Sequence, residues 1–337
     1  MGVSRETMYH FAEPLLQFAC QKSGCDSQWL DRVMDSIVGS DARSQPFFPT
    51  FSGLCYDGFP LQLCVSSSRD GEEIILIGDP FANITEMTLR VSESVKSVAS
   101  LLYLTQCNDL ENLISATIDA IVPKDEKDIS GLSLGALWLA AGVTTKSFAL
   151  YTCASWGSDR DRKWEKIAKW FANVLKRDYQ ARVTIDSLKC IAIPECACIE
   201  GSVAGHVRAK IYFRLCTAST GDSLSFLPVA DPIVLEFLET VIQRRNIAFS
   251  GIIFSIGFLV ETGKISDSKI DVCCHCVVRK PSEWKAVFAE LHRLDPLVRF
   301  DNSSEIVDRE HVELACIGIG LDTRKRVRIN TYWKPTA

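Results

Sequence analysis

Basic and aromatic side chains alternate with apolar ones along residues 206–215, which read HVRAKIYFRL. Successive side chains of a β-strand point to opposite faces. As a strand, this segment places His206, Arg208, Lys210, Tyr212 and Arg214 on one face and five apolar side chains on the other. Such a strand suits the wall of a wet cavity that attracts anions. The exposed face of an ordinary antiparallel sheet is the alternative interpretation.

Two later segments repeat this pattern. Taken as strands, they carry two polar faces, Lys269 with Asp271, Cys273 and His275, and Arg328 with Asn330 and Tyr332. The opposite faces carry mainly apolar side chains. Basic groups stabilise negative charge, and tyrosine rings attract cations through their faces. Three strands with the same pattern favour an internal cavity lined by these polar faces over a sheet face exposed to solvent.

The elements that must position these faces recur along the chain. The pattern predicts five strand pairs, at 60–67 and 72–79, 136–143 and 147–154, 188–193 and 206–215, 252–260 and 269–278, and 312–321 and 327–333. Helices are predicted at 5–22, 27–38, 83–104, 109–121, 159–175, 232–244 and 281–293. Antiparallel pairs do not suit a parallel sheet, which alternates single strands with helices.

Ten antiparallel strands are enough to close a barrel wider than the eight-stranded kind. The sequence therefore predicts an α+β fold, a ten-stranded antiparallel β-barrel ringed by helices. We expect one domain over 1–337, with the helices of 1–45 packed outside the barrel.

Composition limits the classes of function. The chain has 337 residues, 47% hydrophobic residues and a net charge of −5, and it contains no apolar run long enough for a membrane span. A slightly acidic protein argues against nucleic acid as a partner. The N-terminus lacks a signal-peptide pattern, so we expect a cytoplasmic protein whose 14 cysteines are free thiols. A monomer and a homodimer both remain open.

Several segments resemble one family of enzymes. They are YDGFPLQL at 56–63 with ILIGDP at 75–80, CIAIPEC at 190–196 with RAKIY at 208–212, FSGII at 249–253 with KIDV at 269–272, and 327–335. In this order and spacing they resemble the dimethylallyltryptophan synthase family of indole prenyltransferases, a branch of the ABBA aromatic prenyltransferases. The resemblance extends from about Phe47 to Pro335 and rests on no single specific motif.

The resemblance implies transfer of a prenyl group from a prenyl diphosphate to an indole or a similar electron-rich aromatic molecule. Diphosphate departure requires nearby cations, and the allylic cation requires aromatic faces and exclusion of water. The predicted substrate-binding residues are Arg208, Lys210, Tyr212, Lys269, Tyr151, Arg328 and Tyr332.

This sequence departs from the family pattern at four positions. Gln62 replaces a glutamate that takes the indole proton, and an amide cannot accept a proton at ordinary pH. Ile75 and Ala149 replace two cations, and Asp271 falls where the family tends to have a tyrosine. If the substrate is a diphosphate, Mg²⁺ bound with it is one way to supply the missing charge.

These departures support a second hypothesis, in which the barrel cyclises or isomerises an already prenylated compound with Asp271 or His275 as the acid. Gln62, Asp271 and His275 are therefore the catalytic candidates. A barrel that only binds a hydrophobic ligand is the third hypothesis. No permanently bound cofactor is expected. A zinc site at Cys273–Cys276 is not favoured, because successive residues of a strand point to opposite faces and at most two of the four could share a metal ion.

Overall fold

A computed structural model describes residues 6–46, 52–124, 128–129, 135–154, 156, 159–203, 205–216, 231–243 and 251–336. Phe47, Phe249 and Ser250, which belong to the segments quoted for the family resemblance, lie outside this set. Among the described helices, none combines the length and the apolar character that crossing a bilayer requires.

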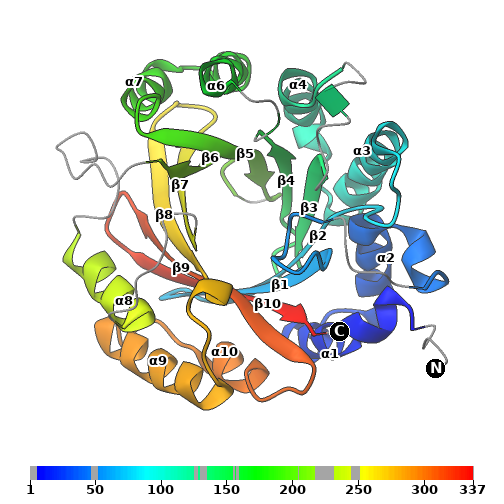
Figure 1. Ribbon diagram of the computed structural model, residues 1–337, viewed down its shortest axis with the longest axis vertical. Helices are drawn as coiled ribbons and strands as arrows, with labels where there is room; N and C mark the ends of the chain where they lie inside the picture. The colour runs from blue at the N-terminus through cyan, green and yellow to red at the C-terminus, as the bar shows by residue number, and fades with distance from the viewer. Residues whose placement is uncertain are drawn as a thin grey trace.

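Ten antiparallel strands close into a barrel, as predicted (Figure 1). Around the barrel the strands follow the order β1-β10-β9-β8-β7-β6-β5-β4-β3-β2, so each strand pairs with its neighbour in the chain and β1 closes on β10. The strands are β1 (Leu61–Ser68), β2 (Gly71–Gly78), β3 (Leu137–Gly142), β4 (Phe148–Cys153), β5 (Ala192–Gly201), β6 (Arg208–Leu215), β7 (Ile252–Leu259), β8 (Ile265–Cys273), β9 (Val312–Asp322) and β10 (Val327–Pro335).

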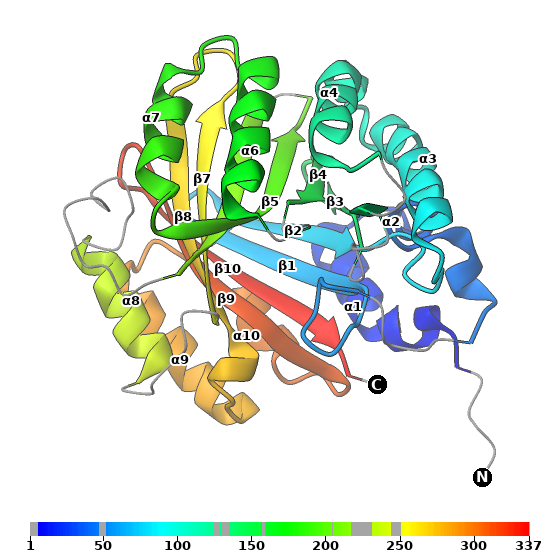
Figure 2. The ribbon, with the colours of Figure 1, turned by 45° about the horizontal axis from the view of Figure 1, so that its top comes forward.

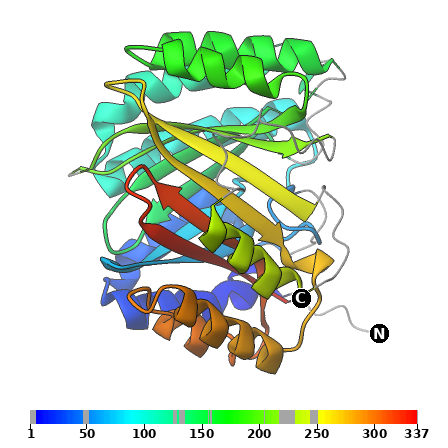
Figure 3. The same cartoon turned by 90° about the vertical axis from the view of Figure 1, so that its left-hand side faces the viewer.

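Helices surround the barrel, and the view down its axis shows them on the outside only (Figure 1). They are α1 (Met8–Ser23), α2 (Ser27–Val38), α3 (Met87–Thr105), α4 (Glu111–Ile121), α6 (Arg160–Val174), α7 (Tyr179–Leu188), α8 (Pro232–Ile242), α9 (Pro281–Leu294) and α10 (Asp301–Ile306). Short 3-10 helices are η1 (Ser40–Arg43), η2 (Asn108–Leu110) and η6 (Cys274–Cys276). The N-terminal pair α1 and α2 lies outside the barrel (Figure 3).

The outward faces of the strands form the main hydrophobic core with the helices. On β6, Ala209, Ile211 and Phe213 are fully buried. On the helix side, α6 packs on β5 and buries Trp164, whose indole N–H donates to the carbonyl of Ala192 at 3.0 Å (Figure 2). Burying one such large apolar side chain contributes about 1.5–3 kcal/mol, so this layer fixes which face of each strand points inward.

Two strands differ from their predicted ranges, and two helices were not predicted. β5 spans Ala192–Gly201 rather than 188–193, because the strand continues through Pro194 by means of an irregularity in its pairing with β6. β8 begins at Ile265 and ends at Cys273, rather than spanning 269–278. The unpredicted helices are α7 and α10.

A buried ion pair ties α3 to the end of β2. An oxygen of Asp79 lies 2.6 Å from the guanidinium of Arg90, and both side chains are almost fully buried. The other Asp79 oxygen accepts hydrogen bonds from Ser52 at 2.8 Å and from the Trp138 indole at 3.3 Å. One carboxylate thus joins a helix, a strand and a loop.

We predict that Arg90→Met lowers the free energy of unfolding by about 3–5 kcal/mol, because it leaves the Asp79 carboxylate buried without its cation. Urea unfolding followed by circular dichroism measures this. The matched control is the double variant Arg90→Met/Asp79→Asn, which removes both charges and should lose less stability. A double variant as unstable as the single one would contradict this explanation.

Candidate active site

The inward faces of the strands line two connected cavities. The larger has a volume of about 650 Å³ and the smaller about 170 Å³. Both are lined by Ile77, Tyr151, Tyr212, Lys269 and Tyr332, so the three tyrosines and the lysine stand where the two cavities meet. A small molecule that extends from one cavity into the other therefore passes these side chains.

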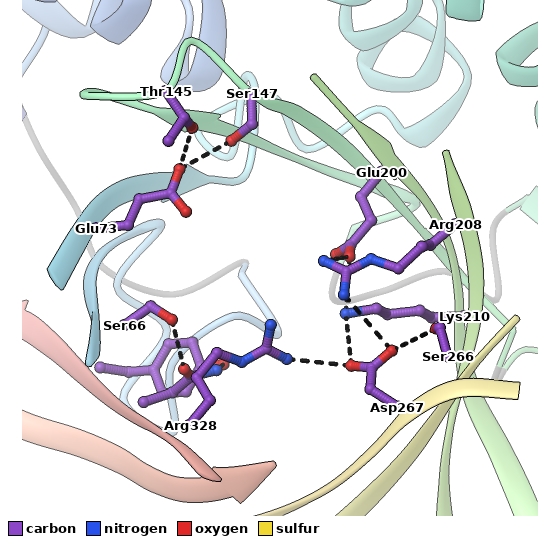
Figure 4. Close-up of polar contacts among 12 residues, drawn as sticks. Ser66, Glu73, Thr145, Ser147, Glu200, Arg208, Lys210, Ser266, Asp267 and Arg328 are labelled. Carbon is purple, nitrogen blue, oxygen red and sulfur yellow. Dashed lines mark hydrogen bonds and ion pairs between the residues drawn. The ribbon is translucent and has the colours of Figure 1, made fainter. Parts of the chain in front are cut away.

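Three cations that line the larger cavity contact two carboxylates, Glu200, which also lines it, and Asp267 (Figure 4). Arg208 and Lys210 of β6 both contact Glu200 of β5, with the Lys210 nitrogen 2.8 Å from the carboxylate. Asp267 of β8 lies 3.6 Å from Arg208, 3.4 Å from Lys210 and 3.1 Å from Arg328 of β10. We call these five residues the charge cluster. Four strands, β5, β6, β8 and β10, contribute to it, so it depends on the curvature of this part of the barrel wall.

The charge cluster shifts the pKa values of its members. Burial raises the pKa of Glu200, but the charges of Arg208 and Lys210 outweigh it and hold that pKa below its ordinary value. Burial acts in the same way on Asp267, yet Lys210, Arg208 and Arg328 hold its pKa far below the usual range. Burial lowers the pKa of Lys210 itself. Both carboxylates are therefore ionised at neutral pH.

Lys269 and the tyrosines form a second group beside the charge cluster. The ammonium of Lys269 lies 2.7 Å from an oxygen of Asp271 and donates a hydrogen bond of 2.7 Å to the Tyr332 hydroxyl. It also lies 5.4 Å from the ring centre of Tyr212 and 5.1 Å from that of Tyr332. Tyr151 packs on Tyr212 with ring centres 5.8 Å apart. Two aromatic faces thus flank a position where a cation is already attracted, and the ring of Tyr151 packs on one of them.

The tyrosines of the lumen remain neutral phenols. Burial raises the pKa of Tyr151, Tyr212 and Tyr332 well above the ordinary tyrosine value. Neutral rings attract a carbocation through their faces without supplying a nucleophilic phenolate. This is the environment that a reaction through an allylic cation requires.

Gln62 lies in the smaller cavity. Its amide nitrogen donates to the carbonyl of Leu54 at 3.0 Å and contacts the Cys55 sulfur at 3.4 Å. Asp271, Trp138 and the Glu195–Arg214 ion pair line the same cavity, the ion pair with a separation of 3.5 Å. With its nitrogen occupied in this way, Gln62 offers its oxygen as a hydrogen-bond acceptor.

The structure brings nine of the ten predicted site residues together. The larger cavity is lined by Arg208, Lys210, Tyr212, Lys269, Tyr151, Arg328 and Tyr332, and the smaller one by Gln62 and Asp271. Ile75 and Ala149 also line the larger cavity, at the positions where the family resemblance implies cations. The predicted orientation of these strands is confirmed, whereas the roles of the residues stay predictions.

His275 is the exception. Because β8 ends at Cys273, the alternation stops there and His275 falls in η6. Its ring is exposed and stacks on Tyr56, with ring centres 4.1 Å apart, and it lines neither of the two cavities. The prediction that His275 shares the inward face of Lys269 is therefore wrong. No group of three or more potential ligands for a metal ion occurs among the described side chains.

Sequence reasoning missed both carboxylates of the charge cluster. Glu200 lies on the part of β5 beyond Pro194, and Asp267 lies on β8 before the predicted start at Lys269. The period of two along a strand could have identified both residues. Asp267 lies two residues before Lys269, and Cys196, Cys198 and Glu200 follow one another at intervals of two.

Comparisons with known proteins find the fold but no close relative. No family model and no curated protein matches the sequence. Among solved structures, 5-dimethylallyltryptophan synthase from Streptomyces coelicolor has a TM-score of 0.78 at 14% identity, covering 98% of this chain and 97% of that one. 6-Dimethylallyltryptophan synthase from Micromonospora olivasterospora, in complex with DMASPP and Trp, has a TM-score of 0.77 at 14% identity, covering 98% and 97%. AnaPT from Neosartorya fischeri has a TM-score of 0.67 at 11% identity, covering 100% and 95%.

The chain therefore has the ABBA barrel of the aromatic prenyltransferases over its whole length. At identities of 11–14% the likeness establishes the fold, and the activity has to be argued from the site itself.

We predict that protonation of the charge cluster destabilises the protein in acid. The pKa values of Glu200 and Asp267 are lower in the folded than in the unfolded chain, so their contribution to stability is complete above about pH 4 and is lost as the pH falls further. The variant Asp267→Asn should show a shallower decline of the free energy of unfolding below about pH 4. Urea unfolding across this range measures the slope. The exposed Asp119→Asn is the control and should decline like the parent protein; equal slopes for both variants would contradict the prediction.

Proposed function

We propose that the protein transfers a prenyl group from an allylic phosphate ester, in the first instance the diphosphate, to an indole or a similar electron-rich aromatic acceptor. The observation that carries the proposal is the junction of the two cavities, which Tyr151, Tyr212, Tyr332 and Lys269 all line. The charge cluster lies on one side of this junction and the apolar, amide-bearing pocket on the other. The ABBA barrel, which several solved prenyltransferases share, supports the proposal.

Each part of the lumen has a role in this reaction. The allylic C–O bond breaks and its electron pair stays on the phosphate oxygen, which Arg208, Lys210 and Arg328 stabilise. The tyrosine rings stabilise the allylic cation, and the closed barrel keeps water from quenching it. The π electrons of the acceptor ring then form the new C–C bond to the allylic carbon.

The ring proton must leave after this bond forms. Gln62 cannot accept it, but its oxygen can accept a hydrogen bond from an acceptor N–H and so orient the ring. Asp271 lines the same cavity and carries a carboxylate beside Lys269. In our proposal Asp271 takes the proton, and Gln62 positions the acceptor.

Mg²⁺ does not have an evident place among these side chains. The carboxylates of the charge cluster already contact Arg208, Lys210 and Arg328, and the charges of these three side chains oppose a divalent cation beside them. Any Mg²⁺ would arrive as part of the substrate, bound to the phosphate. The proposed mechanism therefore contains no step that depends on it.

The second hypothesis, acid-catalysed cyclisation, finds less support. Of its two proposed acids, Asp271 is engaged in an ion pair with Lys269, and His275 is exposed outside the two cavities. An ion-paired carboxylate accepts a proton rather than donating one. This arrangement favours transfer over protonation of a bound alkene.

The direct test is mass spectrometry of incubations with dimethylallyl, geranyl and farnesyl diphosphate and a panel of indoles. A product heavier by one prenyl group, formed together with free diphosphate, supports the proposal. Turnover of a prenylated indole without an added donor would support the cyclase hypothesis instead. Binding of the substrates without any turnover would indicate a ligand-binding barrel.

We predict that Lys210→Ala lowers turnover by about tenfold to a hundredfold, the equivalent of a lost charge-assisted contact of about 1.5–3 kcal/mol. The reason is that Ile75 and Ala149 leave few other cations to replace it. Steady-state kinetics with the best donor and acceptor measure the effect. Lys264→Ala, which removes an exposed lysine at the β7–β8 turn, is the control. Equal activity of the two variants would remove Lys210 from the phosphate site.

We predict that Asp271→Asn lowers kcat by about a hundredfold, as loss of a general base does, while the KM for the donor changes little. The asparagine keeps the size of the side chain but cannot accept the proton. Kinetics at saturating donor and acceptor separate the two parameters. An unchanged kcat, or an effect confined to the KM of the donor, would show that Asp271 is not the base.

A further inference from the structure

The charge cluster contains an unusual amount of negative charge for a site that receives an anion. Its three cations, Arg208, Lys210 and Arg328, carry +3, and Glu200 and Asp267 carry −2, so the cluster as a whole carries +1. The neighbouring pair of Lys269 and Asp271 is neutral. The cations that would hold a leaving group are therefore already largely neutralised by the protein.

Asp267 is held in place beside the cations that line the larger cavity. Asp267 is 6% exposed and accepts a hydrogen bond of 2.7 Å from Ser266, in addition to its three cationic neighbours. It lies opposite Gly257 of β7, where an added Cβ would stand 2.3 Å from its oxygen. A larger residue on β7 would fill the place that this carboxylate occupies. The surroundings thus favour a carboxylate that stays in place when a ligand enters.

An anion that enters the site must share Arg208, Lys210 and Arg328 with these two carboxylates. Bringing uncompensated negative charge into a buried site is costly, and the cost rises with the charge of the anion. A phosphate monoester carries about −1.5 to −2 at neutral pH. A diphosphate ester carries more, so it would leave a larger uncompensated charge in a cluster of +1.

The other charged side chains of the described residues that line the larger cavity leave the net charge of +1 unchanged. At its mouth, Arg326 is paired with Asp322 at 2.7 Å, and Glu73 accepts hydrogen bonds from the hydroxyls of Thr145 and Ser147. Arg324, which is exposed on the β9–β10 turn, offsets the charge of Glu73. Near the charge cluster, β4 and β7 contribute no charged side chain to the cavity lining.

We propose that Glu200 and Asp267 determine specificity by limiting the negative charge of the leaving group, so that the lumen favours an allylic monophosphate ester over the diphosphate. The proposal rests on the prenyl transfer proposed above and names its donor class. The reaction is unchanged: the allylic C–O bond breaks, its electron pair stays on the phosphate oxygen, and inorganic phosphate leaves in place of diphosphate.

Titration calorimetry with inorganic phosphate and inorganic diphosphate, at constant ionic strength, tests the charge preference without requiring activity. The parent protein should bind phosphate at least as tightly as diphosphate. In Glu200→Gln/Asp267→Asn, diphosphate binding should become tighter by about tenfold or more, because the cluster then carries +3. Glu200→Gln alone should give a smaller shift in the same direction, and it serves if the double variant does not fold by circular dichroism.

Glu73→Gln is the matched control, because it removes one negative charge from the same cavity without touching the charge cluster. It should change diphosphate binding much less than Glu200→Gln. A parent protein that binds diphosphate at least tenfold more tightly than phosphate would overturn the proposal, and so would equal effects of Glu73→Gln and Glu200→Gln.

Activity assays with dimethylallyl monophosphate and dimethylallyl diphosphate complete the test. Faster product formation from the monophosphate supports the proposal, and faster formation from the diphosphate overturns it while leaving the proposed prenyl transfer intact. If neither ester gives a product but the calorimetric preference holds, the proposed prenyl transfer fails and the charge selection by Glu200 and Asp267 stands.

Discussion

The alternation of side chains along each strand of a closed barrel is the constraint on which the rest of the structure depends. A closed barrel has an inside and an outside. Side chains alternate along each strand, so every second residue faces the lumen and the residues between them face the helices. On β6 the outward residues Ala209, Ile211 and Phe213 are fully buried against the helices. Their burial forces Arg208, Lys210 and Tyr212 inward. The polar lumen is therefore a consequence of how the outer hydrophobic layer packs.

A polar lumen in turn needs internal compensation of its charges. Lys210 is 4% exposed and Asp267 6% exposed, and neither would be stable there without the other members of the charge cluster. The cluster joins β5, β6, β8 and β10, so it also links four strands across the barrel. In our proposal, the same contacts that stabilise the lumen also limit the negative charge that a substrate can bring into it.

The barrel is shared with solved prenyltransferases at 11–14% identity, which shows how little of the sequence the fold requires. Fold alone does not define an activity. In this chain Tyr212 and Tyr332 lie beside Lys269, and Ile75 and Ala149 are on the cavity wall. Glu200 and Asp267 contact the cations of the lumen and reduce its positive charge. In our proposals the tyrosines serve prenyl transfer, and the reduced charge selects the donor.

The sequence by itself determined the barrel and the orientation of its inner faces. Alternation is a local property, so the inward positions of Lys210, Lys269 and Tyr332 could be predicted without knowing the tertiary structure. Strand ends could not be predicted, because pairing with a neighbouring strand carries β5 past Pro194 and stops β8 before His275. The ion pairs of Glu200 join the adjacent strands β5 and β6, and their register depends on the irregular pairing near Pro194. The ion pairs of Asp267 join β8 to β6 and β10, which lie two strands away on either side, and the curvature of the barrel wall brings these side chains together. The net charge of the lumen was therefore decided by the tertiary structure.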